Sequence, residues 1–254
     1  MNKDEVEFSV IGLGHFGYFW AKEVSKHRQP FCFDINSSIS HDVNSFGKFV
    51  SLEECLSKDI IFITIPIRAV PDFLESNNYI FKPGSLLVDC ASVKLEVHKW
   101  YERYLPSNVG FALTHPLFGP DSAKNGLAGH SIAYTGTRNM NGKAEYLLDF
   151  LSNKLELNIL KMNEEEHDKL MAYNLSLVHL LGRALNELHI AEIPLKMSAL
   201  KHMSQITEFV MNDKIELFED FFNYNPYAGS IRANFIKALE MFSEAKLESV
   251  TNLK

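Results

Sequence analysis

A short apolar run that ends in a glycine-rich turn and passes into a helical pattern limits the possible folds of this chain more than any other feature. Residues 7–14, EFSVIGLG, form the run, and residues 15–27 repeat apolar side chains at helical spacing. The turn places Gly12, Gly14 and Gly17 in the spacing G-x-G-x-x-G. Strand, tight turn and helix in this order are typical of the first unit of a dinucleotide-binding α/β fold.

Strand-like segments recur after this first unit. They cover residues 30–35, 59–67, 84–91, 109–115, 130–136 and 157–162. The segments between them are mostly helical in pattern, as in 70–77, 93–105 and 141–155. Continuous apolar strands that alternate with helices predict a mainly parallel sheet covered on both faces. We therefore predict a Rossmann-type α/β domain over residues 1–162.

The pattern changes after residue 162. Residues 163–190 contain no proline and one glycine, and their apolar side chains recur at helical spacing, with Asn163 and Glu166 spaced as in a capping box. Residues 195–211, 213–224 and 228–247 also read as helices. We predict an all-α domain over 163–254. Because it is too small for a large core of its own, we expect it to pack on the sheet domain and on a second subunit, giving a homodimer.

Composition narrows the class of partner. The 254 residues carry a formal net charge of -7, so we expect neither nucleic acid nor a membrane surface as partner, and a small molecule is the better expectation. The longest apolar run, 60–67, is too short to span a membrane and contains a proline. The amino terminus lacks the layout of a signal peptide. Cys32, Cys55 and Cys90 show no metal-ligand spacing, so we expect no metal site, buried reduced thiols and a cytoplasmic location.

The glycine turn and an acid twenty residues later predict the cofactor. Gly12 permits the tight turn, Gly14 lets a pyrophosphate approach the backbone, and Gly17 lets helix pack close to strand. Asp34 follows the second strand, where it can accept hydrogen bonds from the adenosine ribose, and no arginine follows it, which favours NAD over NADP. Alternatively, Asp34 only caps a turn. The predicted cofactor-binding residues are Gly12, Leu13, Gly14, His15, Phe16, Gly17, Asp34, Ile65 and Pro66.

Residues 114–122, THPLFGPDS, closely resemble the H-P-M-F-G-P-[DE]-S segment of the prephenate and arogenate dehydrogenases. Three further features resemble that family in order: GLGHFG with Asp34, the segment DCASVK at 89–94 (family pattern D-x-x-S-V-K), and His167-Asp168 followed by His179 and Gly182-Arg183. The resemblance covers nearly the whole chain. It implies an NAD-dependent oxidative decarboxylation, in which hydride passes to NAD, a base takes the hydroxyl proton, and loss of the ring carboxylate aromatises the product.

Oxidising an alcohol requires a hydrogen-bond acceptor at the hydroxyl, and a neutral imidazole can serve near neutral pH. His115 is our candidate, because it follows an apolar strand at the carboxyl edge of the sheet, where ligands bind in such folds, and Pro116 restricts its backbone. The resemblance adds Ser92, which would hydrogen-bond the substrate hydroxyl or orient His115, and Lys94, which would organise the site. Alternatively, Ser92 caps the next helix and Lys94 is a solvated residue at its start.

The resemblance places His167 and His179 in the substrate cleft, although a histidine on an apolar helix is more often a core residue. We expect His167 and Asn174 to share one helix face, and His179 and Arg183 another. Family members commonly hold a substrate carboxylate with an arginine on a later helix, but residues 202–221 contain none, and Glu208 would repel an anion. Residues that could replace it are Arg183, Lys201, His202 and Arg232, the last from a partner subunit.

Three hypotheses follow. The leading one is an NAD-dependent prephenate dehydrogenase that makes 4-hydroxyphenylpyruvate for tyrosine biosynthesis. The second is an arogenate dehydrogenase, or a dehydrogenase of another small hydroxy acid. The third is a catalytically idle NAD-binding protein, against which the joint presence of His115, Ser92 and Lys94 argues. Because both halves are assigned, we expect no fused chorismate mutase or regulatory domain.

Overall fold

The structure, a computed structural model, describes residues 5–243. The chain divides into two compact units, of which the first ends at His167 and the second begins at Asp168. The sequence predicts a boundary between residues 162 and 163. The division between the two compact units lies within the helix Glu164–Met171.

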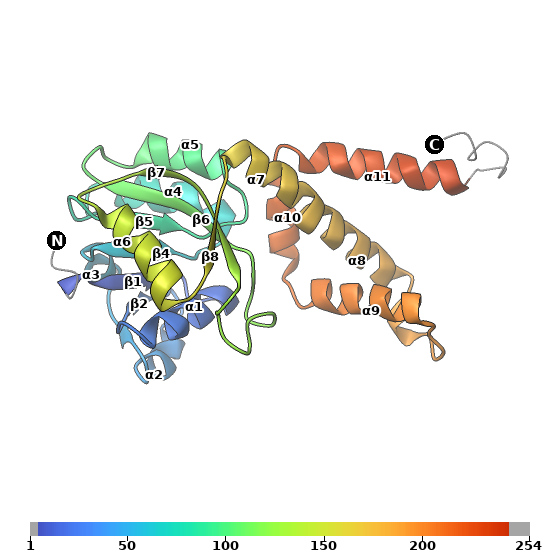
Figure 1. The fold of residues 1–254 in the computed structure, drawn as a ribbon, viewed down its shortest axis with the longest axis horizontal. Coiled ribbons are helices and arrows are strands. Elements are labelled where there is room, and N and C mark those ends of the chain that lie inside the picture. The colour runs from blue at the N-terminus through green and yellow to red at the C-terminus, as the bar shows by residue number, and fades with distance from the viewer. Residues whose placement is uncertain (1–4, 244–254) are drawn as a thin grey trace. The chain divides into compact units, whose positions relative to one another are not determined.

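The first unit is built on an eight-stranded sheet with the order β3-β2-β1-β4-β5-β6-β7-β8 (Figure 1). The strands are β1 (Phe8–Ile11), β2 (Phe31–Phe33), β3 (Lys48–Phe49), β4 (Ile60–Ile63), β5 (Leu86–Asp89), β6 (Gly110–Pro116), β7 (Ser131–Arg138) and β8 (Asn158–Lys161). The six strands from β3 to β6 in this order are parallel, β7 is antiparallel to β6, and β8 is parallel to β7. The predicted Rossmann-type fold and its mainly parallel sheet are confirmed.

Two details of the sheet differ from the sequence-based expectation. The strand β3 was not predicted, because two residues with one exposed side chain leave no apolar pattern to detect. The strand β7 runs antiparallel to its neighbour, because residues 117–130 reach it without a helical crossover.

Helices cover both faces of the sheet. On one face lie α1 (His15–Ser25) and α6 (Lys143–Asp149), and Trp20 of α1 meets Phe62 of β4 with ring centroids 5.4 Å apart. On the other face lie α3 (Leu52–Leu56), α4 (Val70–Asn77) and α5 (Leu95–Tyr104), and Tyr101 of α5 packs on Phe111 of β6. A short helix, α2 (Ser40–Val43), follows β2. Every residue of the central strands β1, β4, β5 and β6 is buried, as expected of a parallel sheet covered on both faces.

The second unit is helical. Its helices are α7 (Glu164–Met171), which starts in the first unit, α8 (Val178–Glu187), α9 (Ser198–Met211), α10 (Ile215–Tyr224) and α11 (Ala228–Ser243). The single helix predicted over 163–190 is interrupted by a π-helical turn, Ala172–Leu177, and ends at Glu187. The predicted cap is present, since the Asn163 side chain accepts a hydrogen bond from the Glu166 N–H (2.8 Å). Residues 244–247 of the last predicted helix lie outside the described residues.

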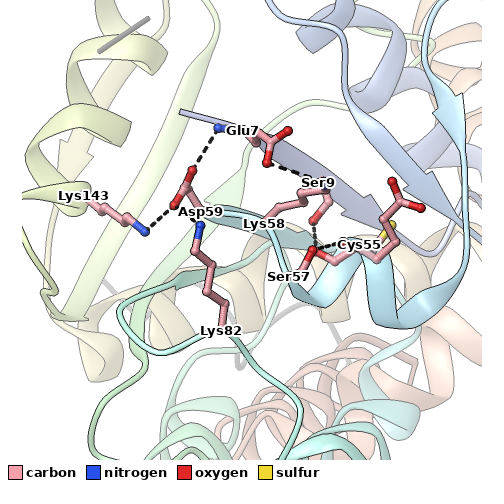
Figure 2. Close-up of polar contacts among 9 residues, drawn as sticks. Glu7, Ser9, Cys55, Ser57, Lys58, Asp59, Lys82 and Lys143 are labelled. Carbon is pink, nitrogen blue, oxygen red and sulfur yellow. Dashed lines mark hydrogen bonds and ion pairs between the residues drawn. The ribbon is translucent and has the colours of Figure 1, made fainter. Parts of the chain in front are cut away.

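The amino-terminal edge of the sheet is tied together by ion pairs around Asp59 (Figure 2). This carboxylate, just before β4, accepts hydrogen bonds from Lys143 at the start of α6 (2.8 Å) and Lys82 before β5 (2.9 Å). The Glu7 N–H before β1 donates to its other oxygen (3.2 Å), and Lys58 pairs with the Glu7 side chain (3.4 Å). These contacts hold three sheet segments and α6 at the edge opposite to the ends of the parallel strands where ligands bind.

Candidate active site

The predicted site residues of the first unit follow the carboxyl ends of successive parallel strands. Gly12 follows β1, Asp34 follows β2, Ile65 follows β4 and Ser92 follows β5, while His115 lies at the end of β6. Because strands β2, β1, β4, β5 and β6 are neighbours and parallel, these positions share one edge of the sheet. The order of the strands reverses between β1 and β4, which is where doubly wound folds bind their ligands.

The geometry of the turn after β1 explains each glycine. Gly12 has φ +92, and a Cβ there would lie 2.7 Å from the Ile65 side chain. A Cβ on Gly17 would collide with the carbonyl oxygen of Gly12, because α1 packs closely against β1. A Cβ on Gly14 would meet nothing within 4 Å. Gly14 is also the N-cap residue of α1, and no side chain accepts a hydrogen bond at this end of the helix. The first N–H groups of α1 are therefore available to bind an anion.

Asp34 is half-buried and fixed by the backbone. Its Oδ2 accepts a hydrogen bond from the Leu13 N–H (2.6 Å), and its Oδ1 accepts one from the Asn36 N–H (2.7 Å). The second bond is the turn cap that the sequence analysis kept as an alternative, while the first joins Asp34 to the glycine turn. Each carboxylate oxygen can accept a further hydrogen bond, so the cap and a bond to a ribose hydroxyl are compatible.

A buried ion pair fixes the loop after β5. The Lys94 ammonium pairs with Asp89 at the end of β5 and donates a hydrogen bond to the carbonyl of Thr114 (2.6 Å). The Thr114 hydroxyl donates to the carbonyl of Asp89 (2.6 Å). Both Lys94 and Asp89 are at most 1% exposed, so the solvated lysine considered for Lys94 is wrong. The pair joins the loop that carries Ser92 to the strand residue that precedes His115.

Ser92 does not cap the following helix. The helix α5 begins at Leu95 with Lys94 as its cap residue, so the capping alternative for Ser92 is also wrong. Ser92 is 9% exposed, and its hydroxyl has no hydrogen-bond partner among the residues that the structure describes. A buried hydroxyl without a partner carries a desolvation cost. This atom is therefore suited to a hydrogen bond with a ligand.

His115 and His167 form a buried pair. The Nδ1 atom of His115 lies 2.9 Å from the Nε2 atom of His167 on α7, and the rings are nearly perpendicular. His167 is fully buried and His115 is 9% exposed. Burial, the neighbouring His167 and the Lys94 cation together hold the pKa of His115 well below its usual value. A neutral imidazole can accept a proton, as the predicted role requires.

In the second unit, His179 and Arg183 lie in a cluster around α10. The His179 ring stacks on Phe218, and its Nε2 lies 3.4 Å from the Asp213 carboxylate. Burial and the nearby Arg183 lower the pKa of His179 to about 4. Arg183 lies over the Phe218 ring and donates to the carbonyl of Asp213 (3.2 Å), which follows α9. The predicted adjacency of His179 and Arg183 is confirmed, and both contribute to packing within this unit.

The other candidates of the second unit are more exposed. Arg232 on α11 lies over the Phe222 ring, 5.8 Å from its centroid, and Lys201 and His202 are exposed on α9. Asn174 is exposed and donates to the Leu170 carbonyl. His167 is buried, so His167 and Asn174 have different surroundings, and their shared helix face stays a prediction. A seven-residue spacing returns to the same face only in a regular α-helix, and Asn174 lies in the π-helical turn.

The sequence analysis missed the roles of Asp89 and Thr114. Asp89 carried one signal in the sequence, because it is an acid at the end of a buried strand and lies five residues before a lysine. No signal marked Thr114, because its two contacts are made across the sheet. Residues 5–243 contain no cluster of three or more potential metal ligands, and none of their helices is long and apolar enough to cross a membrane.

The chain is similar to proteins of one family along most of its length. Residues 42–154 match the family described as "Prephenate dehydrogenase, nucleotide-binding domain", and residues 184–251 match "TYRAAT1-like, C-terminal domain". The chain is 27% identical to arogenate dehydrogenase 2, chloroplastic, of Arabidopsis thaliana over 88% of its own length and 65% of that protein. It is 24% identical to arogenate dehydrogenase 1 of the same plant over 92% of its own length and 38% of that protein.

The fold is also that of a solved dehydrogenase. The prephenate dehydrogenase from A. aeolicus, crystallised in complex with hydroxyphenyl propionate and NAD+, superposes with a TM-score of 0.77 at 19% identity, covering 97% of this chain and 92% of that chain. At this identity the comparison concerns the fold. The chain spans about two thirds and about two fifths of the lengths of the two curated plant relatives.

Proposed function

We propose that the chain is an NAD-dependent dehydrogenase that converts prephenate to 4-hydroxyphenylpyruvate, because residues 42–154 match the nucleotide-binding domain of prephenate dehydrogenases and the chain is 27% identical to an arogenate dehydrogenase. The observation that carries this proposal is the buried, neutral His115 at the end of β6, on the same edge of the sheet as a Ser92 hydroxyl that has no partner among residues 5–243. Oxidation of an alcohol requires a proton acceptor, and a hydroxyl without a protein partner can hydrogen-bond the substrate.

The turn after β1 fits NAD. The open space at Gly14 leaves room for a pyrophosphate against the N–H groups that begin α1. The oxygens of Asp34 are held by the Leu13 and Asn36 N–H groups, and they would accept hydrogen bonds from the ribose hydroxyls. A carboxylate at this position would repel the 2'-phosphate of NADP. The contact of Ile65 with Gly12 supports its assignment, with Pro66, to the wall of this site.

In the proposed reaction, the residues of the chain hold and move one proton. Ser92 would hydrogen-bond the substrate hydroxyl, and His115 would accept its proton while the C–H electrons leave as hydride. The bond to the ring carboxylate would break to release CO2, and the proton would return from His115 to the phenolic oxygen of the product. NAD, when bound, supplies the hydride acceptor. The Lys94–Asp89 pair fixes the loop that carries Ser92, and its bond to Thr114 fixes the strand that carries His115. Lys94 therefore acts by positioning these groups, and its charge helps keep His115 neutral.

Arogenate is the second candidate substrate. The curated plant relatives are named arogenate dehydrogenases, and the absence of an arginine from 202–221 suits a substrate with a different charge pattern. Arogenate carries an ammonium group where prephenate carries a ketone. Another hydroxy acid, or NAD binding without turnover, remains a further outcome of the assay.

We also propose that the protein is a cytoplasmic homodimer. Large apolar side chains are exposed along the helices of the second unit, including Phe209 of α9 (52%) and Leu239 and Phe242 of α11 (54% and 67%). An apolar surface of this kind supports association of two copies. The three cysteines are unpaired, and burial raises the pKa of Cys32 to about 12, which supports a reducing compartment.

The test is NADH formation by the purified protein with prephenate and with arogenate, each with NAD and with NADP. Saturable turnover of prephenate with NAD is the expected result. Preferential turnover of arogenate would reassign the substrate and leave the reaction class intact. Binding of NAD without oxidation of either compound would contradict the proposed activity. Light scattering of the same preparation measures the oligomeric state.

A further inference from the structure

The buried contact between His115 and His167 constrains where protons can lie. Their Nδ1 and Nε2 atoms are 2.9 Å apart, within hydrogen-bond distance. Two protons between these nitrogens would repel, and none would leave two lone pairs facing each other in a buried site. One proton therefore lies between the rings, and one of the two histidines must donate it.

The direction of this hydrogen bond decides whether His115 can act as a base. If His115 donates from Nδ1, its Nε2 atom carries a free lone pair and can accept the proton of a substrate hydroxyl. If His167 donates, neutral His115 carries its own proton on Nε2 and cannot accept another there. The side chain of His167 can thus select the reactive or the unreactive tautomer of His115.

We propose that His167 is a positioning residue that accepts the Nδ1 proton of His115 and so fixes the tautomer with a free Nε2. This inference rests on the proposed function and deepens it, since it assigns His167 to the imidazole that takes the proton and not to direct contact with the substrate. In the reaction, the O–H bond of the substrate breaks and its proton moves to Nε2 of His115. The Nδ1 proton remains shared with His167.

The surroundings of the pair favour a single proton shared between the two rings. The ionisable groups that act on His115 are His167 on α7 and Lys94, which follows β5 and is itself paired with Asp89. Both disfavour a second proton on the resting pair, as does burial. The imidazole of His167 is fully buried and belongs to the same compact unit as His115. Its geometry is therefore fixed by packing.

The tautomer can be measured without any substrate. In protein labelled with 15N-histidine, long-range 1H–15N correlation spectra distinguish Nδ1–H from Nε2–H imidazoles, and spectra of the His115→Asn and His167→Gln variants assign the two signals. We expect His115 in the Nδ1–H form at neutral pH. His167→Gln offers an amide oxygen as acceptor and should retain this form, whereas His167→Leu should give a mixture. A proton on Nε2 of His115 in the wild-type protein would overturn the proposal.

Kinetics provide the second readout. Loss of the acceptor in His167→Leu should lower kcat about 10- to 100-fold, which is at most the lower bound of the contribution of general-base catalysis because part of His115 keeps the reactive tautomer, with an unchanged KM for NAD. His167→Gln should recover most of the turnover. The matched control is His98→Leu, which removes a different histidine contact to α7, the one with the Glu164 side chain (3.0 Å), and should leave kcat unchanged.

The two proposals fail in different ways. If neither prephenate nor arogenate is oxidised, the proposed function is wrong. The tautomer of His115, measured by NMR, still tests the role of His167. If the wild-type protein turns over its substrate and the His167→Leu variant keeps both the wild-type kcat and the Nδ1–H signal of His115, the proposed role of His167 is wrong and the proposed function is unaffected. Should His167→Leu not fold, the wild-type spectrum and the His167→Gln variant still decide the direction of the hydrogen bond.

Discussion

Replacing Asp59 by Asn should destabilise the first unit by about 2 kcal/mol at pH 7, because this carboxylate joins several segments of the sheet edge. It accepts hydrogen bonds from Lys143, Lys82 and the Glu7 N–H, and Lys143 is only 7% exposed. Asparagine preserves the shape of the side chain but removes its charge. A nearly buried ammonium then loses this counter-charge.

The pKa of Asp59 sets the size of the expected loss of stability. Burial acts to raise it, but the hydrogen bonds from Lys143, Lys82 and the Glu7 amide outweigh burial and lower it from 3.8 to about 2. A difference of about two pKa units corresponds to about 2.5 kcal/mol. Since Lys82 is 42% exposed and water screens its contribution, the expected loss is about 1–2 kcal/mol. We expect the upper end of this range because Lys143 is only 7% exposed.

Urea unfolding followed by tryptophan fluorescence measures this loss, because Trp20 and Trp100 both lie in the first unit. The native pKa of Asp59 is below its unfolded value, so its contribution is fully present above about pH 4 and is lost as the pH falls toward 2. The difference between the wild type and Asp59→Asn should therefore shrink over this range. A pH-independent difference would refute the electrostatic explanation. Glu23→Gln, which removes an exposed pair with Lys26, is the control and should change stability little.

Three further predictions follow from the geometry. His115→Asn should lower kcat at least about 100-fold, while the Kd for NAD, measured by calorimetry, should be unchanged. Because the pKa of His115 lies well below 6.5, protonation of His115 should lower the wild-type kcat/KM only at a pH far below 6.5. Asp34→Ala should raise the KM for NAD about tenfold or more, by loss of hydrogen bonds to a charged acceptor, and an unchanged KM would exclude the ribose contact. The pKa of His179 is about 4 when folded and 6.5 in the reference state, so the second unit should lose stability as the pH falls from 6.5 to 4, and urea titrations of His179→Phe should lack this slope.

Local patterns predicted much of the fold because they reflect local physics. The apolar strands, the glycine turn and Asp34 could be read in order along the chain, since the periodicity of side chains and the backbone freedom of glycine act over a few residues. The Asn163 cap was visible for the same reason, because both of its partners lie within one helical turn. The edge strand β3 escaped because it is too short to carry a pattern.

The candidate site was predictable in its residue types but not in its contacts. The resemblance indicated Ser92, Lys94 and His115, and the parallel sheet predicted that they share an edge. Neither the resemblance nor the strand order revealed that Lys94 is buried against Asp89 and Thr114, or that the Ser92 hydroxyl has no partner in the part of the chain that the structure describes. These contacts join segments up to 25 residues apart, and no local pattern encodes which side chains meet across a sheet.

The sequence by itself determined the order of the strands and helices apart from the short β3, the glycine turn and the chemical groups at the carboxyl edge, because each depends on neighbouring residues. Only the tertiary structure decided which of these groups are charged, neutral or unpaired. His115 is 52 residues from His167, and the pKa of His115 depends on burial and on charges brought close by packing. The acceptor role of an imidazole is therefore a property of the folded chain.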